Sequence, residues 1–165
     1  MTENGLYIVN KSGIKFLEEQ KTYIGIAENT KLSSRPFYLG LKDKDDSRLI
    51  YMIPMTKVDT DAKRQKIYKH INMKPNQLGA SFYELTKIDG VEQAFRISDV
   101  FIVTDSMIRP WTLRSSHFVF QDQILIQNVS KKLKIMIRHY KLNPIESPNK
   151  LIQCRNFLLA LNNQV

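Results

Sequence analysis

Hydroxyl and cationic side chains gather at the ends of two neighbouring apolar runs. Thr56 and Lys57 directly follow one run, and Ser34 and Arg35 directly precede the other. Such groups can cleave RNA without a metal, because RNA carries its own nucleophile, the 2′-hydroxyl. The protein then has to accept that proton, stabilise the crowded phosphorane and protonate the leaving 5′-oxygen. We therefore take Thr56, Lys57, Arg35 and Ser34 as candidate catalytic residues.

A strongly cationic segment, residues 60–73, follows these groups. It has a helix N-cap at Thr60 or Asp61, good helix-forming residues and only a narrow apolar stripe. We expect its cations and histidine to contact phosphates, and one of two tyrosines to stack on a base. The residues predicted to bind nucleic acid are Lys63, Arg64, Lys66, Tyr68, Lys69, His70 and, in the preceding hairpin, Tyr38. The alternative is a solvated helix face without a partner.

The charge of the whole chain points to a polyanion. The net charge is +9, with a pI near 9.6. Residues 57–74 hold six cations and two acids, residues 131–165 hold seven cations and one acid, and the segment between them is slightly acidic. A phosphate backbone is the simplest partner for such a protein. For Lys131, Lys132, Lys134 and Arg138 the sequence leaves both a phosphate contact and a solvated face open.

The sequence argues against metal, nucleotide-binding and serine-hydrolase sites. His70, His117 and His139 form no metal-binding pair of the HxxxH kind, and the sequence contains no GxxxxGK[ST], GxGxxG or GxSxG motif. Cys154 is the only cysteine and lies in an apolar helical stretch, so we expect a buried structural thiol. We predict that the protein needs no metal and no cofactor.

The elements that position these residues follow from periodicity and turn signals. We predict strands at 6–9, 22–27 and 100–104, a hairpin over 36–55, and a second hairpin around Asp89-Gly90. We predict helices at 12–19, 60–73, 122–140 and 149–161. Pro54 should end its strand or lie at a sheet edge. The pattern indicates one domain, residues 1–165, of the α+β class with a mostly antiparallel sheet, in which the first hairpin brings Arg35 and Thr56 to one end.

No apolar run approaches the roughly 20 residues that span a bilayer. The first ten residues are too short and too polar for a secretory signal. We therefore expect a cytoplasmic protein without a membrane partner.

The order of these segments resembles a known family. The motif runs Arg35-Pro36-Phe37-Tyr38-Leu39-Gly40-Leu41, a charged turn, Tyr51-Met52-Ile53-Pro54-Met55-Thr56 and then the basic helix. A later stretch is Ala94-Phe95-Arg96-Ile97-Ser98-Asp99-Val100-Phe101-Ile102-Val103-Thr104. Over residues 5–140 this order is similar to the ToxN/AbiQ toxins of type III toxin–antitoxin systems, particularly the CptN- and TenpN-like branches.

The resemblance implies a Kid/MazF (PemK)-like fold, a twisted sheet of barrel-like form with helices packed around it. It also implies a metal-independent endoribonuclease that leaves a 2′,3′-cyclic phosphate, causes growth arrest and serves in phage defence. Its inhibitor would be a small RNA antitoxin of pseudoknot repeats, which the toxin processes and with which it forms a hetero-oligomer.

The family's catalytic hydroxyl corresponds to Thr56, its nearby lysine to Lys57 and its cation before the hairpin to Arg35. Family members often have a second hydroxyl before the lysine, whereas this chain has Lys57-Val58-Asp59, so Ser33 or Ser34 is the remaining candidate for that hydroxyl. Two alternatives stay open: a basic RNA- or DNA-binding module that is not an enzyme, and an inactive toxin homologue.

Overall fold

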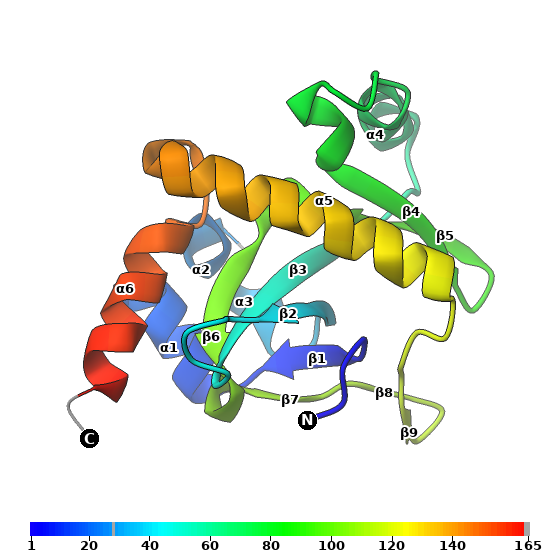
Figure 1. Cartoon of the computed structure of the whole chain (residues 1–165). Helices are drawn as coiled ribbons and strands as arrows, with labels where there is room; N and C mark the ends of the chain where they lie inside the picture. The colour runs from blue at the N-terminus through cyan, green and yellow to red at the C-terminus, as the bar shows by residue number, and fades with distance from the viewer. Residues whose placement is uncertain (28, 164–165) are drawn as a thin grey trace.

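One long strand, β3 (Leu49–Lys57), organises the sheet of the computed structural model, which describes residues 1–27 and 29–163 (Figure 1). On one side β3 pairs with β2 (Phe37–Lys42). On its other side the first half of β3 pairs with β6 (Phe101–Thr104) and the second half with β5 (Val91–Arg96). All these pairings are antiparallel, so two different strands share one edge of β3.

The remaining strands extend the sheet on both sides of this centre. β4 (Tyr83–Ile88) pairs with β5 through the Asp89-Gly90 turn, and β1 (Leu6–Val9) lies between β2 and β7 (Ile108–Pro110). A separate ribbon joins β8 (Thr112–Leu113) to β9 (Ser116–His117). The α+β class and the antiparallel sheet are confirmed. In the part of the chain that the structure describes no ladder joins β4 to β7, so the sheet is open and the expected barrel-like closure is not seen.

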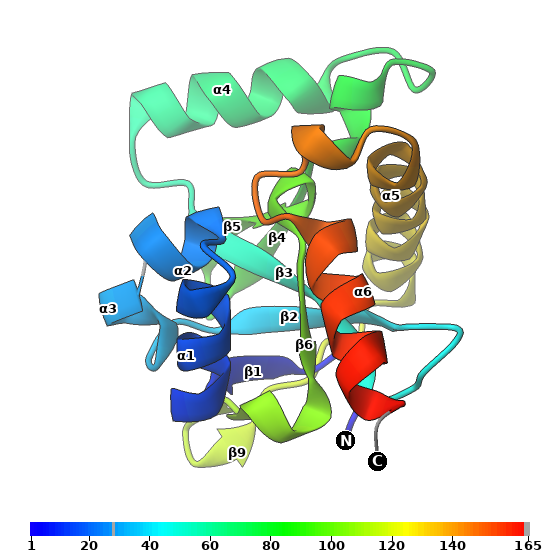
Figure 2. The ribbon, with the colours of Figure 1, turned by 90° about the vertical axis from the view of Figure 1, so that its left-hand side faces the viewer.

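Helices cover both faces of the sheet, with α1–α3 on one side and α5 on the other (Figure 2). Their bounds are α1 Lys11–Glu19, α2 Tyr23–Ala27, α3 Asn29–Leu32, α4 Asp61–Ile71, α5 Gln123–Leu142 and α6 Leu151–Asn162. The predicted apolar stripe of α5 is largely confirmed, since Val129, Leu133, Met136, Ile137 and Tyr140 are buried. Asp122 caps α5 by accepting from the backbone N–H groups of Ile124 and Leu125.

Residues 22–27 form helix α2, so the strand predicted there is wrong. The Thr22 hydroxyl accepts from the Gly25 N–H at 3.0 Å and donates to the Leu17 carbonyl at 2.9 Å. The Ile24 N–H donates to Asn149 Oδ1 at 2.8 Å, across 125 residues of chain. A Cβ at position 25 would lie 2.4 Å from the Leu17 carbonyl oxygen, so the close approach requires glycine. These contacts outweigh the β-propensity of the segment.

Pro54 neither ends its strand nor lies at a sheet edge, because β3 continues to Lys57 and Pro54 pairs with Phe37. On the other edge of β3, Pro54 lies between the residues that pair with β6, ending at Met52, and those that pair with β5, starting at Met55. The ladder is already interrupted at this point. A residue without an N–H is therefore tolerated inside a central strand.

Two hydrophobic clusters hold the chain together. The main core lies between the sheet and helices α1, α2, α5 and α6, and includes Cys154, whose burial raises the pKa of its thiol to about 11. A much smaller cluster fixes α4 to β4 and β5, and its buried members are Val58, Ile67, Tyr83 and Ala94. We call α4, β4 and β5 with this cluster the α4 arm, and the rest of the molecule the body.

Candidate nucleic-acid interface and active site

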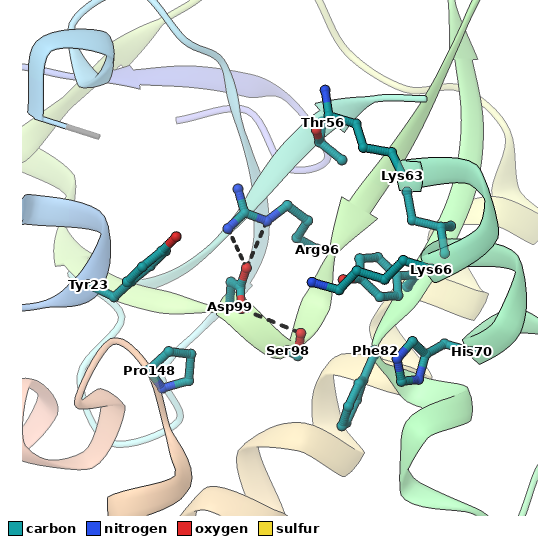
Figure 3. A pocket seen from close by; sticks show the side chains of 12 residues that line it. Tyr23, Thr56, Lys63, Lys66, His70, Phe82, Arg96, Ser98, Asp99 and Pro148 are labelled. Carbon is teal, nitrogen blue, oxygen red and sulfur yellow. Dashed lines mark hydrogen bonds and ion pairs between the residues drawn. The ribbon is translucent and has the colours of Figure 1, made fainter. Parts of the chain in front are cut away.

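A cleft of about 510 Å³ lies beneath α4, between the arm and the body (Figure 3). We call it the α4 cleft. One wall consists of Lys63, Lys66 and His70 from α4, and the opposite wall includes Tyr23 of α2. In Figure 3 the side chain of Lys66 extends into the space, and Tyr23 points toward it from across the cleft. Cations thus face an exposed aromatic ring over an open space.

A second cleft of about 590 Å³ opens beside α3, and we call it the α3 cleft. All four candidate catalytic residues line it: Ser34, Arg35, Thr56 and Lys57. Three residues, Thr56, Lys63 and Arg96, line both clefts. The two clefts therefore adjoin at the end of β3, and the hairpin brings Arg35 and Thr56 to one place as the sequence predicts.

Thr56 and Lys57 nevertheless point to opposite faces of the sheet, because side chains alternate along a strand. Thr56 pairs with Ala94, so its side chain shares a face with Ala94 and is a diagonal neighbour of Arg96. Figure 3 shows the side chain of Lys63 reaching toward Thr56. Lys63, rather than Lys57, is thus the ammonium on the same side as the Thr56 hydroxyl. From the sequence alone, Lys63 is a candidate for nucleic-acid binding and not for catalysis.

Arg35 braces the end of the hairpin. Its guanidinium donates to the Met55 carbonyl oxygen, with an Nε–O distance of 3.1 Å. This contact continues the link between the two strands beyond the last β2–β3 pair, Phe37 with Pro54. The Ser34 hydroxyl donates to the Lys31 carbonyl at 3.3 Å, at the end of α3. The guanidinium of Arg35 is therefore half-buried in the wall of the α3 cleft, and Ser34 lies at its exposed rim.

A kink between β5 and β6 brings Arg96, Ser98 and Asp99 to the site, and none of the three was among the predicted site residues. The 3-10 turn η2 (Ile97–Asp99) interrupts the two strands, and Arg96 Nε donates to Asp99 Oδ2 at 2.7 Å across it. Ser98 and Asp99 line the α4 cleft together with Arg96. The sequence signal for these three residues is a polar stretch between two apolar strands. Connections of this kind matter because a rigid scaffold presents functional side chains on them.

Contacts from distant elements hold the kink in place. The Tyr140 hydroxyl donates to the Ser98 carbonyl at 2.6 Å, and Asn149 Nδ2 donates to the Asp99 carbonyl at 2.7 Å. The Ile97 N–H donates to the Phe82 carbonyl at 2.8 Å. The backbone of the kink is therefore held by α5, by the segment before α6 and by the residue before β4, and Asp99 in turn holds the guanidinium of Arg96.

The predicted helix of the binding site forms as expected, with Thr60 as its N-cap. Lys63 and Lys66 face the α4 cleft. Lys63 Nζ also contacts Asp59 Oδ1 at 2.7 Å, and the hydrogen bond from Lys63 lowers the pKa of Asp59. Lys69 is exposed but lines neither cleft, and Arg64 donates to the Val58 carbonyl at 3.4 Å.

His70 lines the α4 cleft beside aromatic rings. Its ring centroid lies 4.9 Å from that of Phe82 and 5.6 Å from that of Tyr83. Burial, followed by the charges of Lys69 and Lys66, lowers the pKa of His70. A neutral imidazole at neutral pH is able to accept a proton.

Of the two tyrosines predicted to stack on a base, Tyr38 is buried, and the half-buried Tyr68 lies outside both clefts. Tyr38 is 2% exposed, because it lies in β2 and packs on Phe95 and Phe120 with its hydroxyl donating to Asn4 Oδ1. The Tyr68 hydroxyl donates to Glu92 Oε2 at 3.2 Å, and Tyr68 lines neither cleft. Tyr23 is the exposed aromatic residue in the α4 cleft, at 48% exposure. It was not among the predicted residues, because residues 22–27 were expected to form a strand.

Within residues 1–27 and 29–163 no three His, Cys, Asp or Glu residues group closely enough to hold a metal ion. Over the same residues, none of the helices combines the length and the apolar content that crossing a bilayer requires. No protein-family model matches this chain, and no curated protein is significantly similar to it. The function therefore has to be argued from the geometry of the clefts and from the charge around them.

Proposed function

We propose that the adjoining α3 and α4 clefts bind a single strand of RNA and cut it without a metal. The observation that carries this proposal is that Thr56, Lys63 and Arg96 line both clefts. A hydroxyl, an ammonium and a guanidinium thus meet where a strand passing from one cleft to the other has to lie. Tyr23 offers an exposed ring for an unpaired base, which is how proteins commonly hold single-stranded RNA.

The reaction needs only groups present in RNA and in these clefts. The 2′-oxygen forms a bond to phosphorus, the bond from phosphorus to the 5′-oxygen breaks, and the products end in a 2′,3′-cyclic phosphate and a 5′-hydroxyl. One proton leaves the 2′-hydroxyl and one joins the 5′-oxygen. His70 and the α4 lysines carry these protons in our proposal. The Thr56 hydroxyl, Arg96 and Arg35 stabilise the charge on the phosphorane.

The resemblance to the ToxN/AbiQ toxins extends this proposal. The protein would be the toxin of a type III system with a Kid/MazF-like fold, acting in the cytoplasm, and would be inhibited by a repeated RNA antitoxin that it also processes. The mostly antiparallel sheet is compatible with that fold, and the charge of +9 fits an RNA partner. Protein purified with its neighbouring genes should then retain a short repeated RNA, and purification without RNA would contradict this extension.

Replacement of Thr56 tests the catalytic proposal. Thr56→Val removes the hydroxyl at nearly constant shape and should reduce cleavage of a labelled single-stranded RNA by about 100-fold, the scale of one proton-transfer or charge-stabilising group. Thr56→Ser should retain most activity. Thr86→Val is the matched control, since Thr86 lies on β4 and lines neither cleft. Cleavage should persist in EDTA, and the product should carry a cyclic phosphate.

One observation favours the alternative, a module that binds RNA without cutting it. The Thr56 hydroxyl makes only a long contact, 3.5 Å, with the Lys57 carbonyl, and no basic side chain of the described residues lies within hydrogen-bond distance of it. Binding of the labelled RNA without cleavage by the parent protein, together with loss of binding in a Lys63→Ala, Lys66→Ala double variant, would support this alternative. Unchanged cleavage in Thr56→Val would instead refute the catalytic role of Thr56. Loss of cleavage in EDTA would refute the metal-free mechanism.

A further inference from the structure

The exposed face of α5 carries a row of cations that belongs to neither cleft. Lys131, Lys134, Arg138 and Lys141 are all exposed and are spaced by three and four residues, which places them on one side of the helix. The row is about 15 Å long at the rise of an α-helix. No residue of α5 lines the α3 or the α4 cleft.

This row lacks the acidic neighbours that lysines and arginines on a solvated protein surface normally have. α5 contains no Asp or Glu over its 20 residues. No carboxylate of the described residues lies within 4 Å of the four cations, whereas Lys132, next to the row, pairs with Glu84 at 2.7 Å. Like charges at these spacings destabilise a helix. The row therefore presents uncompensated positive charge.

Two hollows lie in the surface beside the row. Lys134, Arg138 and Lys141 surround a hollow of about 250 Å³. At the other end of the row, Lys131 lines a second hollow of about 270 Å³, which reaches the chain just after α4 at Met73 and Pro75. The second hollow thus lies between the Lys131 end of the row and the segment that follows α4, and its cations, Lys131 and Lys132, both come from α5.

We propose that this face of α5 is a second docking surface, which holds the phosphate backbone of a folded RNA while the clefts hold a single strand. The inference rests on the proposed function for the kind of nucleic acid, but not for the surface itself. An anionic membrane is the weaker occupant, because amphipathic helices enter membranes through an apolar face, and the apolar face of α5 is buried in the core. The large apolar side chains of α5 that are exposed, Ile124 and Leu142, lie at the two ends of the helix, so the stretch between them offers mainly cations and polar groups, as phosphate binding requires.

Charge reversal tests this surface. In Lys134→Glu, Arg138→Glu, Lys141→Glu, affinity for a stable RNA hairpin should fall at least about tenfold, and the slope of log affinity against log salt should decrease by about 2 to 3. Binding of an eight-nucleotide single strand should stay unchanged, because it needs only the clefts. A matched control, Lys11→Glu, Lys42→Glu, Lys87→Glu, makes the same change in net charge at exposed sites elsewhere and should bind the hairpin almost as the parent does.

The corresponding glutamine variants, which are less disruptive to folding, should show a smaller loss in the same direction. An equal loss of hairpin binding in the control, or an equal loss of short-strand binding in the α5 variant, would overturn the proposal. So would binding to phosphatidylserine vesicles that depends on the same three residues while hairpin binding does not. Parent protein that binds the hairpin through α5 but neither binds nor cuts the short strand would refute the proposed function and leave this surface standing.

Discussion

The body and the α4 arm are held together by different means. The body is built around a large apolar core and a buried ion pair, in which Arg155 of α6 donates to both oxygens of Asp43 at 2.6 and 2.9 Å. Helix α4 of the arm rests on a cluster of four buried residues and carries four Lys or Arg residues against one Asp, whereas β4 and β5 also contribute Ile88 and Phe95 to the main core. The cationic wall of the α4 cleft therefore lies on the less firmly held part of the molecule.

This difference has a consequence for binding. Segments with few buried apolar contacts open more readily than core strands. Phosphates bound beneath α4 would supply the negative charge that the helix lacks, and would hold the arm against the body. RNA should therefore stabilise the arm more than the body.

The largest effect is expected at the ion pair of the body. The Asp43 carboxylate is buried, which disfavours its charge, yet hydrogen bonds from Arg155 and Tyr51 lower its pKa. Arg155→Ala leaves this charge buried without its partner and should lower the free energy of unfolding by about 3–5 kcal/mol. Arg48→Ala, which removes the pair of the exposed Arg48 with Asp46, should have a much smaller effect, because solvent screens an exposed ion pair. Urea denaturation measures both, and equal effects would show that the Asp43 pair does not support the body.

A smaller and more local effect should distinguish the two hydrophobic clusters. Leu133→Ala in the main core should cost about 2–5 kcal/mol of global stability. It should leave the exchange of α4 amide hydrogens unchanged, because the arm opens while the body stays folded. Ile67→Ala, in the small cluster, should accelerate exchange in α4. Faster α4 exchange in Leu133→Ala would show that arm and body open together.

The smallest effect is expected from pH. The pKa of His70 is lowered in the folded arm, mainly by burial. The unfolded arm therefore binds more protons than the folded arm as pH falls below the ordinary value of about 6.5, so stability falls with it. Protection of α4 amides should decrease between pH 7.5 and 5.5, and His70→Gln should remove most of this dependence. An unchanged dependence in that variant would assign the effect to other groups.

Much of the fold could be predicted because its signals are local. The Asp89-Gly90 turn forms with positive φ at both residues, Thr60 caps α4, and the stripe of α5 faces the core. The hydroxyl and cationic residues at the end of the first hairpin also indicated one part of the site in advance. All four of them, Ser34, Arg35, Thr56 and Lys57, line the α3 cleft. Their catalytic roles remain predictions.

What the sequence determined by itself is therefore the antiparallel α+β plan, the two cationic helices and the grouping of hydroxyl and cation near β3. Only the tertiary structure decided that residues 23–27 form a helix presenting Tyr23, that Tyr38 is buried, and that the register of β3 with β5 places Arg96 beside Thr56. The physical reason is distance along the chain. The bonds from Asn149 to Ile24 and to the Asp99 carbonyl join segments 125 and 50 residues apart, and such contacts leave no periodic trace in either segment.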